Sequence, residues 1–462
     1  MQQSTPADAQ AVALFVFIPF CKIKCTYCDF NAYANLARVM EPYADAVARE
    51  IGLWRGDVQD NVTLSEAKGL THSNEILRFA QNDKRFRAKT IYFGGGTPSL
   101  VPVAHIEKIL RACESAFALV PHPEITLEAN PGTVDADKLC ALHALGVSRL
   151  SIGVQSFDDA ALRRLNRGHT VADALETYDL ARRAGFDNIN LDFIYGLPLQ
   201  TLGHWRATLE RALALAPEHL SLYALKVEAD TGLEFQIKRG KYPMPDDDLA
   251  ADMYELAEEM LDAAGYEQYE ISNWARRVGA RHSPSHTVRQ IGWSNSINVA
   301  GKHDLANASP LRSRHNLTYW HNEPYFGFGA GAHSCFGGER YWNVLSPVEY
   351  IQRVARGESA VAGRESISRE LEMAETMILG LRLNEGIVFD AFAARYGVDA
   401  REKYAAQLRE LGDLGLVEFE RPEGSLPSTP ERSGGARPFG SGVRLTPRGR
   451  LLSNEVFWRL LP

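Results

Sequence analysis

The sequence predicts an α/β protein in which an open barrel of six parallel strands is followed by a helical C-terminal domain. Strand-like runs alternate with amphipathic helical stretches from Leu14 to about Val227. Polar residues fall where these strands end, and after Ser366 the pattern changes to helices. Repeated βα units join parallel strands, so the pattern fits either a doubly wound sheet or an incomplete (β/α)6 barrel.

The strands are predicted from short apolar runs, and the helices between them from apolar residues at helical spacing. The strands are Leu14–Ile18, Thr90–Phe93, Glu124–Glu128, Arg149–Val154, Asn188–Ile194 and Leu220–Leu225. The helices are Val103–Phe117, Asp135–Leu145, Val171–Ala184 and Gly203–Leu215. A chain of 462 residues exceeds one ordinary core. We therefore divide it into residues 1–230, 231–365 and 366–462.

The last segment is predicted to resemble a winged helix, with three helices and a two-stranded wing. The expected elements are helices Arg369–Leu383, Val388–Tyr396 and Arg401–Leu411, strands Gly415–Glu420 and Val443–Thr446, and a closing helix to Leu461. Charges of both signs on the third helix do not make a phosphate-binding surface, so we interpret this domain as a packing or docking module.

Composition restricts the partners and the compartment. A net charge of -8 argues against nucleic acid as the main partner. Residues 1–10 do not resemble a signal peptide, and no apolar run is long enough to span a membrane, so we expect a cytoplasmic protein. Six cysteines in this length are not a disulfide framework. Cys113 and Cys140 lie in helical patterns and are expected in the core, whereas the place of Cys335 is left open.

Cys21, Cys25 and Cys28 follow the first strand with CxxxCxxC spacing. Structural zinc takes four protein ligands, and no second CxxC pair occurs downstream. Three thiolates instead fit a [4Fe-4S] cluster whose fourth iron is open to a small molecule. The motif therefore predicts an iron-sulfur site in the loop after the first strand.

The ends of the other strands carry residues suited to binding, which favours the barrel, because strand ends in a barrel converge on one mouth. The glycine run Gly94–Gly96 follows the second strand and lets backbone carbonyls approach an ammonium group. We read the third strand as ending at Glu128, the fourth at Gln155 and the fifth at Asp192. The two carboxylates are expected to accept hydrogen bonds from ribose hydroxyls, and Arg167 to pair with a carboxylate.

Several segments together resemble the HemW-type heme chaperones, which are radical-SAM proteins similar to oxygen-independent coproporphyrinogen III oxidase. They are FIPFCKIKCTYCDF, FGGGTPSL, LEANPG, IGVQSF, LNRGH, LDFIYGLPLQT, LSLYAL, YEISN, SRHNLTYW and FGFGAGAHS. The resemblance covers nearly the whole chain. It implies a radical-SAM barrel, a [4Fe-4S] cluster on Cys21, Cys25 and Cys28, and S-adenosylmethionine as the ligand of the open iron.

The resemblance also implies which residues line the S-adenosylmethionine site. They are Phe15, Tyr27, Gly95, Gly96, Thr97, Glu128, Gln155, Arg167 and Asp192. Relatives usually carry tyrosine at position 15, so Phe15 keeps the ring and loses the hydroxyl. The oxidase has a fourth cysteine where this chain has Phe30, and it has a longer segment before the cluster. Both departures favour the chaperone.

The stretch HNLTYW resembles the heme-binding motif of these chaperones, which implies His315 as the axial ligand of heme iron. An imidazole beside Tyr319 and Trp320 has the parts of a heme site. His333, in the GAHS stretch, is a second candidate by residue type and is expected near the barrel mouth.

Two polar stretches depart from the family and are interpreted as surface loops. They cover residues of about 60–86 and 277–312, and the second holds His282, His286 and His303. These imidazoles are expected to be solvated rather than to compete for heme or metal.

Two functions follow. The first is a heme chaperone that binds heme and passes it to apo-hemoproteins, with peripheral membrane association and a homodimer left open. The second is a radical-SAM enzyme, in which a 5′-deoxyadenosyl radical abstracts hydrogen from coproporphyrinogen III or drives a methylation.

Overall fold

The computed structural model describes residues 10–54, 86–277, 311–420 and 439–462, and its main feature is a sheet of twelve strands. Six neighbouring strands of this sheet are parallel and follow one another in chain order, as the sequence predicts. They are β1 (Ala11–Ile18), β4 (Arg87–Gly95), β5 (Ala118–Ala129), β6 (Arg149–Gln155), β7 (Ile189–Tyr195) and β8 (His219–Ala224). Their shared carboxyl edge collects the residues that follow each strand.

The sheet continues beyond both sides of this parallel core with six strands that the sequence did not predict. They are β9 (Tyr266–Glu270), β10 (Asn273–Arg276), β11 (Tyr325–Phe328), β12 (His333–Phe336), β13 (Glu339–Asn343) and β14 (Val361–Ser366). Strand β11 is parallel to β1, and the remaining pairings are antiparallel. These strands have only four to six residues, too few for a clear alternating pattern.

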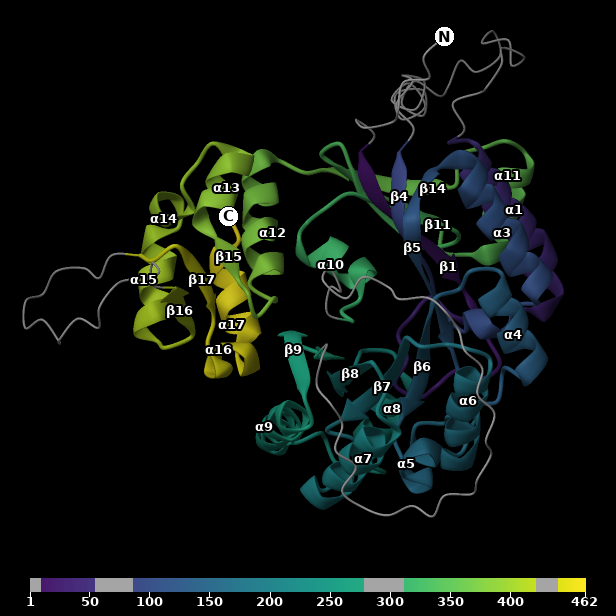
Figure 1. Ribbon diagram of the computed structural model, residues 1–462, viewed down its shortest axis with the longest axis horizontal. Helices are drawn as coiled ribbons and strands as arrows, with labels where there is room; N and C mark the ends of the chain where they lie inside the picture. Colours follow the sequence, from purple (N-terminus) through teal and green to yellow (C-terminus); the bar gives the residue numbers. More distant parts are fainter. Residues whose placement is uncertain (1–9, 55–85, 278–310, 421–438) are drawn as a thin grey trace, which may run out of the picture.

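Amphipathic helices cover the parallel strands and bury one face of each (Figure 1). They are α1 (Met40–Gly52), α3 (Val103–Ala116), α4 (Ala136–Ala144), α5 (Asp159–Arg164), α6 (Val171–Arg183), α7 (Leu202–Leu215), α8 (Gly232–Lys238), α9 (Asp247–Ala263) and α11 (Pro347–Ala355). Val12, Leu14 and Val16 of β1 are fully buried in this core, whereas Phe15 and Phe17 alternate to the other face. Cys113 is buried as predicted, but Cys140 is exposed on the outer face of α4, so its predicted core position is wrong.

Short elements join this frame. They are the paired strands β2 (Phe20–Cys21) and β3 (Tyr33–Ala34), and the 3-10 helices η1 (Ala37–Val39), η2 (Pro98–Leu100) and η4 (Trp458–Leu460).

The C-terminal residues form a second, separate hydrophobic core. Its elements are α12 (Arg369–Gly380), β15 (Ile387–Val388), α13 (Phe389–Tyr396), α14 (Ala400–Lys403), α15 (Ala405–Asp413), β16 (Val417–Glu420), β17 (Gly442–Leu445), α16 (Pro447–Leu451) and α17 (Ser453–Phe457). The third predicted helix is broken at Tyr404, and the closing helix is broken at Leu452. Both residues leave helical geometry with φ near -105°. The sheet has three strands because the two-residue β15 joins the predicted pair.

Helix α10 (Arg314–Trp320) lies between the parallel sheet and the C-terminal helices (Figure 1). Its first turn is held by Glu124 of β5, whose carboxylate accepts hydrogen bonds from the backbone amides of Arg314 and His315, each at 3.0 Å. A carboxylate suits the positive end of a helix. The HNLTYW stretch therefore belongs to an anchored helix.

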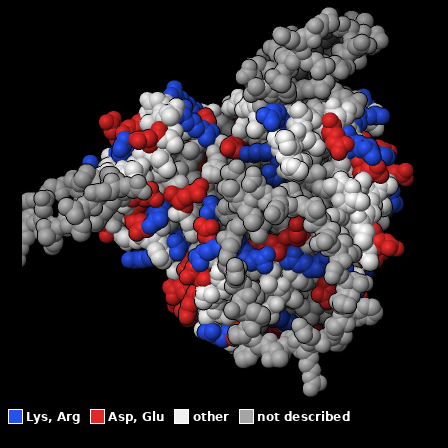
Figure 2. Space-filling model, in the orientation of Figure 1, with Lys and Arg blue, Asp and Glu red and all other residues white. Residues whose placement is uncertain are grey.

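Most of the two polar stretches, with His282, His286 and His303, lies outside the described residues. No helix in the described part is long and apolar enough to cross a membrane. Figure 2 shows Lys and Arg interspersed with Asp and Glu over the visible face.

Candidate functional site

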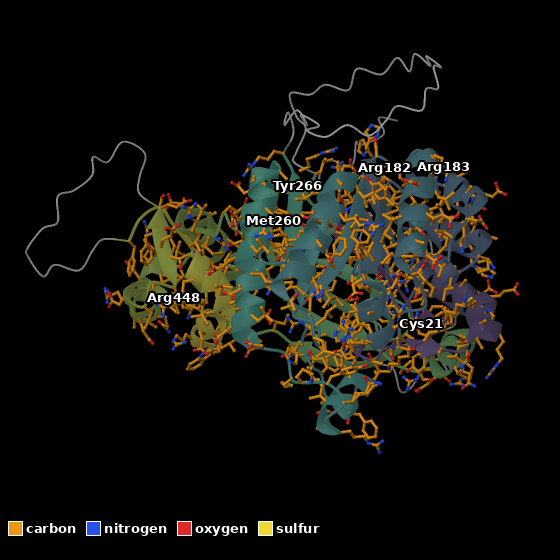
Figure 3. The ribbon with its side chains drawn as sticks, turned by 90° about the horizontal axis from the view of Figure 1, so that it is seen from below. Cys21, Arg182, Arg183, Met260, Tyr266 and Arg448 are labelled. Atoms are coloured by element: carbon orange, nitrogen blue, oxygen red, sulfur yellow. The ribbon has the colours of Figure 1, made fainter. Side chains whose placement is uncertain are left out.

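The three motif cysteines lie in the loop that follows β1, and each is a free, half-buried thiol. Cys21 ends β2, and the amide of Cys28 donates to the Cys25 carbonyl at 3.3 Å. Figure 3 shows Cys21 on the opposite side of the molecule from Arg182, which lies at the last turn of α6. The helices that connect parallel strands run antiparallel to them, so the last turn of α6 lies at the amino edge of the sheet. The thiols therefore lie at the opposite, carboxyl edge, directly after β1, as predicted.

The donor chemistry of this loop fits a cluster better than a closed zinc site. Among the residues that the structure describes, no three His, Cys, Asp or Glu side chains converge closely enough to hold a metal ion, so the three thiols are not gathered in this conformation. Burial raises the pKa of Cys28 to about 11, and the charges of Cys25 and Cys21 act in the same direction. The CxxxCxxC motif supplies three thiols, which suits a centre with one open position.

A chain of hydrogen bonds connects this loop to the ends of β4 and β5. The Cys21 sulfur is 3.5 Å from the Thr97 hydroxyl, and the Asn130 amide donates to that hydroxyl at 2.9 Å. Arg167 donates to the Asn130 side-chain oxygen at 2.6 Å. Sequence reasoning missed Asn130, although its place two residues after Glu128 in LEANPG was the available signal.

Arg167 is the centre of this network. Its guanidinium donates to the Cys25 sulfur at 3.4 Å, to the Tyr27 hydroxyl at 3.5 Å and to the Gly153 carbonyl at 2.8 Å. Its Nε is buried and has no hydrogen-bond partner in the described residues. A small pocket lies here, lined by Cys25, Thr97, Asn130, Arg167, Gly168 and His169 among others. The structure thus brings a cation, a thiol and an unsatisfied donor to one pocket.

The buried carboxylate of Glu128 accepts a hydrogen bond at each of its two oxygens. It accepts a hydrogen bond from the Tyr92 hydroxyl at 2.8 Å and one from the Gly95 amide at 3.0 Å. Burial raises the pKa of Glu128 to about 7, although these hydrogen bonds favour its ionised form. A ribose hydroxyl would have to share oxygens that the protein already uses.

Asp192 lies within β7 and not at its end, so this part of the prediction is wrong. The strand continues through Phe193, Ile194 and Tyr195 because these residues keep pairing with β8. The carboxylate accepts from Ser151 at 2.9 Å and from Asn190 at 2.8 Å, and burial raises its pKa.

Gln155 does end β6, where its φ of 66° turns the chain out of the sheet. The side-chain amide lies close to the backbone of the same strand, because a Cβ added at Gly153 would be 2.9 Å from its nitrogen.

The glycine run serves close packing of the backbone. A Cβ at Gly96 would lie 2.7 Å from the Phe20 carbonyl oxygen and 2.8 Å from that of Ile18. The amides of Gly96 and Thr97 donate to these same two carbonyls. Gly96 therefore lets the end of β4 join the segment that leads into the cysteine loop. The predicted contact of these carbonyls with an ammonium remains a prediction.

Phe15 and Tyr92 separate His315 from the carboxyl edge of the sheet. Their rings stack at 5.8 Å, and Tyr92 stacks on the His315 imidazole at 4.9 Å. His315 is 1% exposed, its Nδ1 is 2.7 Å from the Thr90 hydroxyl, and its Nε2 is 3.0 Å from that of Tyr319. Burial, aided by nearby cations, lowers its pKa to about 3, so the ring is neutral. The imidazole has the ligating form, but both nitrogens are already engaged.

The other aromatic residue of the motif, Trp320, packs against a small apolar cluster of Tyr269, Ala275 and Leu383. The Arg382 guanidinium lies 4.4 Å from its ring. His333, in contrast, is exposed at the start of β12, on the same sheet as the other site residues.

Comparisons with known proteins identify two regions by family. Residues 15–212 match the Radical SAM superfamily, and residues 367–422 match the HemN C-terminal domain. The heme chaperone HemW of Bacillus subtilis is 33% identical over 97% of this chain and 98% of the relative. A mitochondrial radical S-adenosyl methionine domain-containing protein 1 of Bos taurus is 34% identical over 89% of this chain and 84% of its own length.

The fold has a solved counterpart. The structure of coproporphyrinogen III oxidase (HemN) from Escherichia coli matches 99% of this chain and 91% of its own, with a TM-score of 0.71 and 21% identity. That likeness shows the fold, and the full-length similarity to HemW proteins shows the family. This chain belongs to the HemW heme chaperones of the radical SAM superfamily.

Proposed function

We propose that this protein binds heme and delivers it to apo-hemoproteins, and that it carries a [4Fe-4S] cluster with S-adenosylmethionine. Full-length similarity to HemW proteins is the observation that carries the proposal. Cytoplasmic location goes with it, since free thiols and a cluster require a reducing compartment. We also infer the division into residues 1–230, 231–365 and 366–462, and the separate C-terminal hydrophobic core supports its last boundary.

In this proposal Cys21, Cys25 and Cys28 hold the cluster and leave one iron open. When bound, the cluster would supply a one-electron reductant next to the S-adenosylmethionine held at its open iron. The pocket beside Cys25 supports this assignment, because Arg167 brings a cation that suits the carboxylate of an amino acid. Phe15, Tyr27, Gly95, Gly96, Thr97, Glu128, Gln155 and Asp192 are proposed to line the rest of the site.

Replacing Arg167 with methionine is expected to weaken S-adenosylmethionine binding by roughly 10- to 100-fold, the range seen for groups that support a metal site. The variant keeps an unbranched stem but loses the guanidinium and its hydrogen bonds to Asn130 and Gly153. Calorimetric titration of the reconstituted protein measures the effect. Arg183→Met is the matched control, because that side chain is exposed on α6, far from Cys21 (Figure 3). Equal affinities of both variants would contradict the assignment.

Heme binding is tested by anaerobic optical titration of the reconstituted protein with hemin, with and without the cluster. We expect a Soret band that saturates near one heme per chain, and transfer of that heme to apomyoglobin as a probe acceptor. His315 stays the ligand proposed from the motif, and ligation through Nε2 requires that Tyr319 give up its hydrogen bond. A protein that takes up no hemin would contradict the proposed function.

The alternative is the oxidase reaction, which the likeness of the fold to HemN brings into consideration. Phe30 stands where the oxidase carries its fourth cysteine, and its side chain is 61% exposed. Anaerobic incubation of the reduced protein with coproporphyrinogen III separates the two functions. Formation of protoporphyrinogen IX would support the enzyme.

A further inference from the structure

One of the two hydrogen bonds of the His315 imidazole agrees with iron ligation, and the other blocks it. A ligating imidazole gives one ring nitrogen to the metal and donates the N–H of the other to a protein group. Nδ1 of His315 is 2.7 Å from the Thr90 hydroxyl, which can accept that proton. Nε2 is 3.0 Å from the Tyr319 hydroxyl, and a lone pair that accepts this hydroxyl proton cannot bind iron. Iron therefore reaches His315 only after Tyr319 has moved.

The position of Tyr319 is set by the helix that carries it. Tyr319 lies in the last turn of α10, and its ring meets the His315 imidazole edge to face, with centroids 5.1 Å apart. The first turn of α10 is bound to β5 through the two hydrogen bonds of Glu124. Because the first turn is fixed, the groups that hold the last turn decide whether Tyr319 stays over His315.

The chain leaves α10 through a residue in the left-handed region. Asn322 has a φ of 49°, and its amide donates to the Tyr319 carbonyl at 2.9 Å. The Glu323 amide donates to the Thr318 carbonyl at 2.9 Å, which completes a Schellman-type helix end. Glu323 also pairs with Lys89 of β4 before the chain enters β11. The end of α10 is therefore a defined turn.

Two helices of the C-terminal domain bind this turn. Arg395 of α13 donates to the carbonyl of His321 at 3.1 Å and to that of Asn322 at 2.9 Å. The same guanidinium donates to the Glu372 carboxylate of α12 at 3.1 Å. The Asn322 side-chain amide donates to the Thr376 hydroxyl at 2.9 Å and to the Glu372 carbonyl at 3.4 Å. A cation at the carbonyl end of a helix is stabilising, so Arg395 suits this place.

The contact between α10 and the C-terminal domain also has an apolar part. Leu317 and Trp320 of α10 pack in a small cluster with Leu383, which follows α12. The Arg382 guanidinium lies 4.4 Å from the Trp320 ring and 3.7 Å from the Glu270 carboxylate. Figure 1 shows α10 between the parallel sheet and α12. The helix is thus attached to the barrel at its first turn and to the C-terminal domain at its last.

These contacts stabilise a conformation in which His315 cannot ligate iron. A ligand that binds only another conformation has an apparent affinity reduced by the fraction of molecules in that conformation. Each hydrogen bond that holds the last turn of α10 in place therefore lowers the affinity for heme. Removing such a bond is expected to raise it.

We propose that Arg395 and Asn322 are positioning residues of the heme site, which hold Tyr319 over His315 and keep iron from its imidazole until the C-terminal domain releases α10. The inference rests on the proposed heme-binding function and on His315 as its ligand. It makes the C-terminal domain the part of the chain that controls the loading of heme.

The test compares the hemin affinities of full-length wild type, Arg395→Met, Asn322→Gly and Arg444→Met by optical titration. Arg395→Met is expected to bind hemin about tenfold more tightly, the factor that corresponds to losing hydrogen bonds of a charged group. Asn322→Gly keeps the left-handed turn but loses the side-chain bonds, and a gain of about threefold is expected. Arg444→Met is the matched control, because Arg444 is an exposed arginine of the same domain that pairs with Glu418 on the neighbouring strand.

Two further measurements test whether the effect passes through α10 and His315. In a His315→Ala background, Arg395→Met is expected to give no gain, because the imidazole that Tyr319 covers is absent. Hydrogen exchange of the backbone amides of residues 314–323 in the heme-free protein is expected to be faster in Arg395→Met than in wild type and Arg444→Met. Unchanged exchange would remove Arg395 from this role.

The outcomes separate this inference from the proposed function. If wild type binds hemin and neither Arg395→Met nor Asn322→Gly binds it more tightly, the inference is overturned while the heme-binding function stands. A gain that persists without His315 overturns it as well. If wild type takes up no hemin, the function and the inference fall together. Circular dichroism identifies a loss of fold in Arg395→Met, in which case the affinity of Asn322→Gly decides.

Discussion

Replacing Cys25 with serine is expected to lower the iron and sulfide content after anaerobic reconstitution by about tenfold or more. Even changes outside the ligand shell of a metal site cost roughly 10- to 100-fold in metal affinity. A serine hydroxyl is a hard ligand that stays protonated, and it replaces a soft thiolate poorly at iron-sulfur centres. No three ligating side chains converge elsewhere or in this loop in the described part of the chain, so no preformed site is available to take over the role of Cys25. Iron and sulfide analysis, with the visible absorption of the cluster, measures the loss.

Cys140→Ser is the control for this experiment. Its thiol is exposed on α4 and lies outside the CxxxCxxC loop, so this variant is expected to bind as much iron as wild type. Equal iron contents in the Cys25 and Cys140 variants would show that the loop does not hold the cluster.

The second large effect is expected from Glu50, whose carboxylate joins α1 to the strands beyond β1. It accepts hydrogen bonds from the Gly329 amide at 2.9 Å, the Asn343 amide at 2.7 Å and the Tyr350 hydroxyl at 2.5 Å. Burial raises its pKa to about 7, against the three hydrogen bonds, which favour ionisation. The folded state therefore holds this proton more tightly than the unfolded state does.

A raised carboxyl pKa makes the contribution of Glu50 to stability fall as pH rises. The contribution is complete below the unfolded pKa, falls as the pH rises toward about 7, and is constant above it. From pH 5 to pH 8 we expect the free energy of unfolding of wild type, relative to Glu50→Gln, to fall by roughly 2 kcal/mol. Urea unfolding at the two pH values measures this difference.

Glu50→Gln is the informative variant because glutamine has nearly the same volume as glutamate and does not ionise. It is less stable than wild type at pH 5, because an amide cannot accept all three hydrogen bonds. Glu349→Gln on α11 is the control, since its carboxylate is exposed and pairs with Arg353 at the surface. A gap between wild type and Glu50→Gln that stays constant from pH 5 to pH 8 would contradict the raised pKa.

The parallel strands could be predicted because each one is a local pattern. β1 and β6 are short apolar runs followed by polar residues, and a run of this kind marks a strand whatever its neighbours are. β11 and β14 have four and six residues; β11 pairs with β1, the first strand of the sheet in chain order, and helix α11 lies between β14 and its partner β13. Nothing within four residues encodes such a pairing.

Some residues of the candidate site could likewise be predicted from local patterns, and others could not. The cysteines and Thr97 are recognisable because motif spacing is carried by the sequence. The role of Asn130 depends on contacts with Thr97 and Arg167, which come from other segments of the chain. Asp192 was predicted at a strand end because the sequence does not show that β8 continues to pair with the residues after it.

By itself, the sequence determined the family, the cysteine loop and the six parallel strands, since these depend on residue type and spacing along the chain. Only the tertiary structure decided the surroundings of the two candidate histidines. Burial and hydrogen bonding are set by segments that meet in space: β4 and α10 enclose His315 and engage its nitrogens, whereas His333 is exposed on β12 and stacks on Trp342 of β13. The two imidazoles are chemically the same, and their surroundings separate them.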